Sequence, residues 1–174
     1  MFRLTESPRL SEFERQVLPH LDAAYNLARF LMRNDRDAED VVQDASLRAF
    51  RFFENFRGEN SRAWFLKIVR NVAYTTLKKN RPDEMNVEFE EELHGEQTPP
   101  MEAGVAIDRA RDRQTVRAAI EQLPPEFREA ITLREFEGAS YKEIADVAGV
   151  PIGTVMSRLA RARRQLQLIL SHQK

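Results

Sequence analysis

Hydrophobic residues recur at helical spacing in both outer parts of the chain, with polar residues between them. Near the start, one apolar face is formed by Val17, Leu21, Ala24, Ala28 and Leu31. No stretch shows the sustained alternation of Val, Ile or Thr with polar residues that is typical of a β-strand. We therefore predict an all-α fold.

Capping residues and a proline set the expected helix boundaries in the first 80 residues. Pro19 is tolerated only in a first turn, so a long helix either begins beside it or follows a short turn that kinks there. Asp35 or Asp37 is expected to cap a second helix that runs to about Asn55. Ser61 is expected to cap a third helix that runs to about residue 79.

Charge and composition divide the chain into three parts. Residues 81–104 contain Pro82, Pro99, Pro100 and a run of three glutamates at 90–92, which is typical of a flexible, extended linker. The formal net charge is +3 over residues 1–80, −7 over 81–112 and +3 over 113–174. Helical periodicity resumes around Val105. We predict a helical domain in 1–80, an acidic linker in 81–112 and a second helical domain in 113–174.

Composition also excludes several classes of protein. The 174 residues include no cysteine, which rules out disulfide scaffolds, thiol nucleophiles and thiolate zinc sites. No apolar run approaches the length of a membrane span, so the cytoplasm is the expected location. His20, His94 and His172 are scattered, and the chain has no glycine-rich phosphate loop. We therefore expect no enzyme activity, no cofactor and no metal site.

Residues 140–151 carry the local signals of a helix–turn–helix. Ser140 and Glu143 match the capping box, in which each side chain hydrogen-bonds the backbone amide of the other residue. Ala145 is small enough for a second helix to cross nearby. Gly149 supplies a left-handed turn, and Pro151 suits the start of the next helix.

That next helix has an apolar face opposite a face of small, polar and cationic residues. The apolar face consists of Val155, Leu159, Ala162, Leu166 and Ile169. At about 100° per residue, the opposite face consists of Gly153, Ser157, Ala160, Arg161 and Arg164, with Arg158 and Arg163 at its edges. Such a surface fits the DNA major groove, where arginines bind guanine edges or phosphates. An ordinary amphipathic helix with arginines near its C-terminal end would give a similar pattern.

A second candidate surface lies on the helix expected from Ser61. Its inward face of Phe65, Val69, Val72, Ala73 and Thr76 leaves a polar stripe of Lys67, Asn71, Tyr74 and Lys78. Rings and cations mix at Arg48, Arg51, Phe52, Phe53, Phe56, Arg57, Arg62 and Trp64. This mixture favours single-stranded nucleic acid, because rings stack on unpaired bases while arginines bind phosphates. For single rings such as Phe52, Phe53, Phe65 and Trp64, a core position is the more common explanation.

Residues 37–44 place an acidic flank beside two valines that look exposed. One interpretation is a capped helix start with a solvated face. The other is a docking ridge for a basic partner helix, and the pattern does not separate these alternatives.

These motifs resemble the extracytoplasmic-function (ECF) group of bacterial sigma factors, the two-domain subunits that direct RNA polymerase to promoters. The resemblance covers residues 37–44, 47–50, 56–59 and 63–73 in the first half, including Ala63-Trp64-Phe65-Leu66. In the second half it covers 123–129, 137–145 and 153–163, including Leu123-Pro124-Pro125-Glu126. The sequence departs from the family at Met156, where members commonly have Lys or Arg, and at Phe50, where many have Trp.

The resemblance implies a role for each matched segment. The acidic helix would bind the polymerase clamp helices through Asp37, Glu39, Asp40, Val41, Gln43 and Asp44. The loop and third helix would open and read the −10 element, capturing a flipped base, through Phe56, Arg57, Asn60, Ser61, Trp64, Lys67, Arg70 and Asn71. The last helix would read the −35 element through Thr154, Ser157, Arg158, Arg161, Arg163 and Arg164.

The resemblance also implies the fold and the partners. The fold would be a region 2 helical bundle and a region 4 helix–turn–helix joined by the acidic linker, which would thread the basic nucleic-acid channel of the polymerase. The partners would be core RNA polymerase, through its clamp helices and flap, promoter DNA, and an anti-sigma factor that is often membrane-bound. We expect no small-molecule substrate. The alternative is a helix–turn–helix regulator that binds only duplex DNA, which would leave the aromatic stripe and the acidic helix unexplained.

Overall fold

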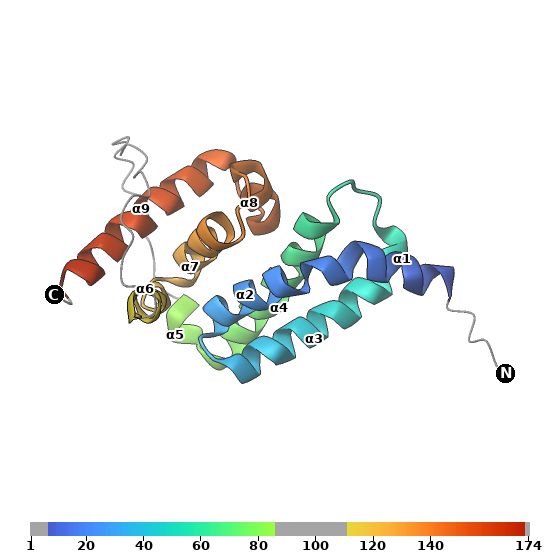
Figure 1. The fold of residues 1–174 in the computed structure, drawn as a ribbon, viewed down its shortest axis with the longest axis horizontal. Helices are drawn as coiled ribbons and strands as arrows, with labels where there is room; N and C mark the ends of the chain where they lie inside the picture. Colours follow the sequence, from blue (N-terminus) through green and yellow to red (C-terminus); the bar gives the residue numbers. More distant parts are fainter. Residues whose placement is uncertain (1–6, 86–110, 173–174) are drawn as a thin grey trace.

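The computed structural model describes residues 7–85 and 111–172, and every regular element within these ranges is helical (Figure 1). The first range contains α1 (Pro8–Val17), a 3-10 turn (Leu18–His20), α2 (Leu21–Met32), α3 (Asp35–Phe52), a second 3-10 turn (Phe53–Asn55), α4 (Ser61–Asn80) and α5 (Pro82–Met85). The second contains α6 (Arg111–Glu121), α7 (Pro125–Ile131), a π-helical extension of α7 (Thr132–Phe136), α8 (Tyr141–Ala148) and α9 (Ile152–Ser171). The prediction of an all-α fold is confirmed.

Asparagine side chains set the starts of α3 and α4, one residue before the nearer predicted cap of α3 and one before that of α4. Asn34, and not Asp35 or Asp37, is the cap of α3, because its side chain accepts a hydrogen bond from the amide of Asp37 at 2.8 Å. Asn60 caps α4 in the same way, which makes Ser61 the first helical residue. The helices themselves lie where the periodicity placed them.

Pro19 lies in the 3-10 turn between α1 and α2, so the kinked arrangement is the one present. The element before the kink is a 10-residue helix and not a short turn. It buries Phe13 and Val17, which explains why it is a full helix. None of the helices in the described ranges is long and apolar enough to cross a membrane.

Helices α2, α3 and α4 form a bundle that combines small and large side chains. The buried residues of α3 are Ala38, Val41, Ala45 and Ala49. The neighbouring helices contribute larger buried side chains, such as Leu27 of α2 and Phe65 of α4. Large side chains opposite small ones fill the interior at the density of a protein core. This bundle is the scaffold for the loop before α4.

The helix–turn–helix forms as its local signals predicted. The amide of Glu143 donates to Ser140 Oγ at 3.1 Å, and the amide of Ser140 donates to Glu143 Oε2 at 2.9 Å. Gly149 ends α8 in the left-handed region with φ of +68°, and Pro151 precedes α9. The capping box and the turn glycine are therefore confirmed.

Titration of this capping box is expected to contribute to acid unfolding. The backbone amide of Ser140 and the side chain of Asn60 hold the pKa of Glu143 below its ordinary value of 4.5. A carboxyl group with a lowered folded pKa stabilises the fold above its unfolded pKa, and this contribution is lost as the pH falls through the folded pKa. We expect the Tm of the wild type to fall more steeply than that of Glu143→Gln between about pH 5 and pH 3, because glutamine also suits this position without titrating. Thermal melts followed by circular dichroism measure both slopes, and equal slopes would contradict the prediction.

The two described ranges pack directly against each other (Figure 1). Helix α4 lies against α8, and α2 lies against α7. Phe30 of α2 contacts Phe136 with ring centroids 4.9 Å apart, and buried residues of both ranges form one hydrophobic cluster. Nothing in the sequence pattern indicated this contact. Of the predicted linker, residues 86–110, with Val105, lie outside the described residues, whereas its first residues form α5 and its last two begin α6.

Candidate nucleic-acid interface

Helix α9 has the two-sided character that its sequence predicted. Its buried side consists of Val155, Leu159 and Ala162, with Leu166 and Ile169 partly buried. Gly153, Ser157 and Arg164 lie on the exposed side. Met156 is 53% exposed, so an apolar side chain stands beside the polar face. This side of α9 is accessible to a partner in the arrangement described.

Two arginines at the edges of that face are held by glutamates of the same half. Arg158 Nη2 lies 3.4 Å from Glu126 Oε1 of α7, and its side chain is 16% exposed. Arg163 Nη2 lies 2.7 Å from Glu135 Oε1 of the π extension. The Nη2 group of each arginine is therefore occupied by a glutamate in this arrangement. The other predicted residues of this surface, Thr154, Ala160 and Arg161, are partly buried.

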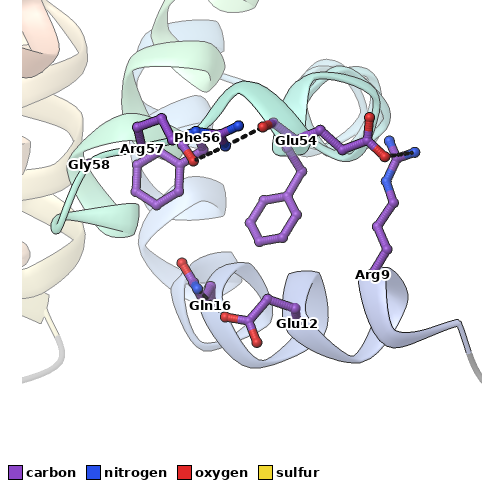
Figure 2. Close-up of a pocket in the computed structure, with 8 residues that line it drawn as sticks. Arg9, Glu12, Gln16, Glu54, Phe56, Arg57 and Gly58 are labelled. Carbon is purple, nitrogen blue, oxygen red and sulfur yellow. Dashed lines mark hydrogen bonds and ion pairs between the residues drawn. The ribbon is translucent and has the colours of Figure 1, made fainter.

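The loop before α4 lines a surface pocket of about 450 Å³ beside α1. Figure 2 shows Phe56 and Arg57 of the loop on one side of this pocket and Glu12 and Gln16 of α1 on the other. Arg57 donates to the backbone carbonyl oxygens of Glu54 and Phe56. Its guanidinium therefore braces the loop, although Arg57 as a whole is exposed.

The predicted aromatic residues divide between the core and the surface. Phe53 and Phe65 are buried, so the core explanation holds for them. Phe52 is 52% exposed. Phe56 and Trp64 are half-buried, with ring centroids 4.9 Å apart. These last three rings are the ones accessible for stacking.

Helix α4 directs its predicted DNA-binding residues to two different sides. Lys67 and Asn71 are exposed, whereas Arg70 forms an ion pair with Glu129 of α7. Tyr74 donates a hydrogen bond to the same carboxylate at 3.1 Å. The prediction that Tyr74 belongs to an exposed stripe is wrong, because α7 covers this part of α4.

The carboxylate of Glu129 is buried, and burial shifts the pKa of this group. Glu129 is 1% exposed, and burial raises the pKa of its carboxyl group although Arg70 and Tyr74 oppose this. Burial and the neighbouring carboxylate raise the pKa of Tyr74 well above its ordinary value of 10.0. A buried charge is tolerated only when its partners compensate for the lost water. This cluster therefore depends on contact between α4 and α7.

Further polar contacts join the loop and α4 to the second half. Asn60 Nδ2 donates to Glu143 Oε1 at 3.0 Å, beside a cleft of about 930 Å³ between the loop and the helix–turn–helix. Arg62 donates to the backbone carbonyl of Glu137. Asn26 Nδ2 of α2 donates to Glu137 Oε1 at 2.8 Å. Ser61, the remaining predicted residue of the loop, is partly buried.

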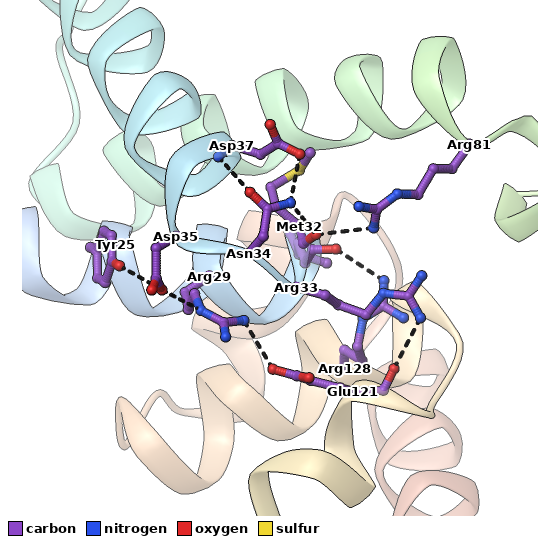
Figure 3. A network of polar contacts seen from close by, with 11 residues as sticks. Tyr25, Arg29, Met32, Arg33, Asn34, Asp35, Asp37, Arg81, Glu121 and Arg128 are labelled. Atoms are coloured by element: carbon purple, nitrogen blue, oxygen red, sulfur yellow. Dashed lines mark hydrogen bonds and ion pairs between the residues drawn. The ribbon is translucent and has the colours of Figure 1, made fainter.

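Arginines join the halves where α2 meets α6 and α7 (Figure 3). Arg29 Nη1 donates to Glu121 Oε1 at 2.9 Å. Arg128, which is 2% exposed, donates to the carbonyl oxygens of Leu123 at 2.7 Å and Leu31 at 3.0 Å. Burial lowers the pKa of Arg128. One guanidinium thus satisfies backbone groups of both halves.

Part of the acidic side of α3 is exposed. The exposed residues are Glu39, Asp40 and Gln43, while Asp37 and Asp44 are partly buried. Asp37 accepts a hydrogen bond from Asn34 at 2.6 Å, and Asp44 pairs with Arg48 at 3.0 Å. A partner protein that docks on α3 would therefore meet Glu39, Asp40 and Gln43 first.

Val41 does not belong to that surface. It is 2% exposed and lies in the core of the bundle. The sequence interpretation that residues 41 and 42 look exposed is wrong for Val41, because Ala38, Val41 and Ala45 share the inward face of α3. Its side chain cannot contact a partner in this arrangement.

A helix–turn–helix with a cationic last helix, attached to a second helical unit with a basic and aromatic loop, is typical of DNA-binding proteins. Comparison with known families identifies the class. Residues 17–82 match Sigma-70 region 2, and residues 113–166 match Sigma-70, region 4.

Curated relatives agree with both matches. The chain is 35% identical to the RNA polymerase sigma-H factor of Pseudomonas aeruginosa over 91% of its own length and 86% of the relative. It is 36% identical to the ECF RNA polymerase sigma-E factor of Escherichia coli, over 75% of this chain and 72% of that one. It is 34% identical to SigE of Mycolicibacterium smegmatis, but spans only 61% of that protein. The chain belongs to the family of ECF RNA polymerase sigma factors.

Solved structures show the same fold. The sigma factor RpoE of Bartonella quintana, crystallised with the anti-sigma factor NepR, matches with a TM-score of 0.70 and 31% identity, covering 92% of this chain and 98% of that one. CnrH matches with a TM-score of 0.67 and 24% identity, over 94% of this chain and 90% of that one, which supports the fold alone.

Sequence reasoning missed the polar residues of α7 and its extension. Phe127, Arg128, Glu129, Ala130 and Ile131 are all buried, so this helix is covered on every side. Helical periodicity detects a helix with one apolar face, and it cannot detect burial of an arginine and a glutamate by a distant part of the chain. The only available signal was the presence of three charged residues, Glu126, Arg128 and Glu129, within a seven-residue helix.

Proposed function

We propose that this chain binds core RNA polymerase and directs it to specific promoters, with residues 1–80 acting as region 2, 113–174 as region 4 and 81–112 as the linker. The observation that carries the proposal is that both sigma regions match on one chain, in this order. A regulator that binds only duplex DNA would need the second region alone. The activity is that of a transcription initiation factor and not of an enzyme.

Within this proposal, the two halves bind different forms of promoter DNA. The accessible side of α9, with the exposed Ser157 and Arg164 and the partly buried Arg161, would read duplex −35 DNA in the major groove. The loop before α4, with Phe56 and Trp64, would stack on bases of the opened −10 element. Half-burial of these two rings supports this role, since a stacking ring must be both anchored and accessible.

Arg161→Ala is expected to weaken binding of region 4 to −35 duplex DNA by about 1–3 kcal/mol, because a well-placed arginine contributes this much to base discrimination. Fluorescence anisotropy with a duplex taken from a mapped promoter measures the change. The matched control is Arg113→Ala, an exposed arginine on α6. Equal affinities of both variants would remove Arg161 from the proposed interface.

The proposed partners follow from the same assignment. The exposed acidic residues of α3 would bind the polymerase clamp helices, and the flap is the expected partner of region 4. RpoE of Bartonella quintana was crystallised with an anti-sigma factor, which supports a protein inhibitor of this kind for the present chain. Because bacterial chromosomal promoters lie in the cytoplasm, a chain that acts at them is expected there.

Transcription in vitro tests the proposal directly. Core polymerase, the full chain and fragmented genomic DNA are combined, and transcript start sites are mapped. Starts that depend on the chain and share two sequence elements upstream are the expected result. Duplex binding without any chain-dependent start would favour the regulator that binds only duplex DNA.

A further inference from the structure

Two exposed apolar side chains lie at the start of α9, beside the polar face of that helix. Ile152 is 46% exposed and Met156 is 53% exposed. They are four residues apart, so they are neighbours on one side of the helix. We call these two residues the apolar edge. Neither of them is among the residues assigned above to the −35 surface.

Buried residues and backbone hydrogen bonds fix the position of the apolar edge. Val155 and Leu159 are each 1% exposed and pack in the core. The amides of Thr154 and Val155 donate to the carbonyl oxygen of Pro151 at 3.0 and 3.2 Å, which fixes the first turn of α9. Because Val155 and Leu159 are held in the core, Met156 is held on the accessible side.

Gly153 leaves the backbone open next to this edge. Its φ does not lie in the left-handed region, and a Cβ atom added there would meet no atom of the surrounding structure within 4 Å. Neither backbone conformation nor packing in the described part of the chain therefore requires a glycine at this position. A bare backbone lets a base pair approach the start of α9 closely, which brings its edge within reach of Met156.

The chemistry of methionine limits what this side chain can recognise in DNA. A thioether has no charge and no hydrogen-bond donor, so it neither binds phosphate nor donates to the acceptors of guanine and adenine. The major-groove edges of the base pairs present one apolar group, the C5-methyl of thymine. The first residues of a recognition helix are the ones that reach base edges, and an unbranched side chain adapts to the position of a methyl group.

Resting on the proposed function, we infer that Met156 recognises thymine in the −35 element. Its side chain contacts the C5-methyl group of one thymine in the major groove, and Ile152, one turn earlier, shields that contact from water. Met156 is thus a specificity-determining residue beside the cationic ones, and it selects a base by apolar contact and not by hydrogen bonding.

Deoxyuridine tests this contact, because it differs from thymidine by that methyl group alone. The full chain is combined with core polymerase, and binding of the complex is measured on duplexes from promoters whose start sites have been mapped. Each thymidine of the −35 element, on either strand, is replaced singly. We expect one replacement to weaken binding about fourfold, which is the usual effect of burying one methyl-sized group.

Two alanine variants assign this effect to a residue. In Met156→Ala, the replacement that weakens wild-type binding should lose its effect. Leu168→Ala is the matched control, since Leu168 is also 53% exposed and lies about 18 Å further along α9. This control should keep the fourfold loss of the wild type. Circular dichroism checks the folding of both variants.

Three outcomes would overturn the inference alone. If no replacement weakens wild-type binding, the chain makes no such methyl contact, while chain-dependent start sites would still support the proposed function. If the fourfold loss persists in Met156→Ala, another residue makes the contact. If Met156→Ala weakens binding to core polymerase without DNA and leaves the loss unchanged, the apolar edge belongs to a protein interface. An absence of chain-dependent start sites would contradict the proposed function, and this inference with it.

Discussion

We expect Arg128→Met to lower the free energy of unfolding by about 3–5 kcal/mol. This is the range, about 3–5 kcal/mol, for removing one partner of a buried charged network. Methionine fills a similar volume but donates no hydrogen bond. The carbonyl oxygens of Leu31 and Leu123 would lose their donor inside a buried site. Urea denaturation followed by circular dichroism measures the change.

The matched control for this prediction is Arg113→Met. Arg113 is exposed on α6, so the same chemical change should alter stability by less than about 0.5 kcal/mol. A loss below about 1 kcal/mol for Arg128→Met would mean that water or rearranged side chains satisfy both carbonyl oxygens, and the structural link between the halves would be weaker than described.

Asp40→Arg is expected to weaken association with core polymerase by about 2–4 kcal/mol, or roughly 30- to 700-fold, because opposite charges at an interface become like charges. Asp40 is exposed on the free side of α3, so the fold should not change. Binding of labelled core polymerase measures the affinity, and a gel shift with −35 duplex DNA should show no difference from wild type.

Asp22→Arg is the control for charge alone. Asp22 is exposed on α2, and its replacement changes the net charge equally. Similar polymerase affinity of both variants would show that the effect is not specific to α3 and would remove Asp40 from the proposed docking surface.

The elements predicted best from the sequence are those built from local bonds. Ser140, Glu143 and Gly149 determine the turn between α8 and α9 through hydrogen bonds and backbone conformation within one short segment. The cap of α3 was misplaced by one residue because Asn34 and Asp35 are both good caps, and sequence patterns do not rank such neighbours.

The parts that could not be predicted depend on contacts between distant residues. Arg70 and Glu129 are separated by 59 positions, and Arg128 and Leu31 by 97. Arg70 has the sequence surroundings of a surface residue, and only the packing of α7 turns it into an interface residue. The prediction that Val41 is exposed is wrong for a related reason, since the positions of α2 and α4 determine which side of α3 is buried.

The local construction of the α8–α9 turn has a consequence for promoter architecture. The hydrogen bonds of its capping box and turn glycine all lie within residues 140–149. Under the proposed function, the helix that reads the upstream element is therefore held by a rigid local turn, which does not itself set the distance to the downstream element. The number of base pairs between the two promoter elements would then be set by the assembled complex of polymerase and sigma factor. Chains with different α9 faces that share one polymerase are expected to use promoters with the same number of base pairs between elements.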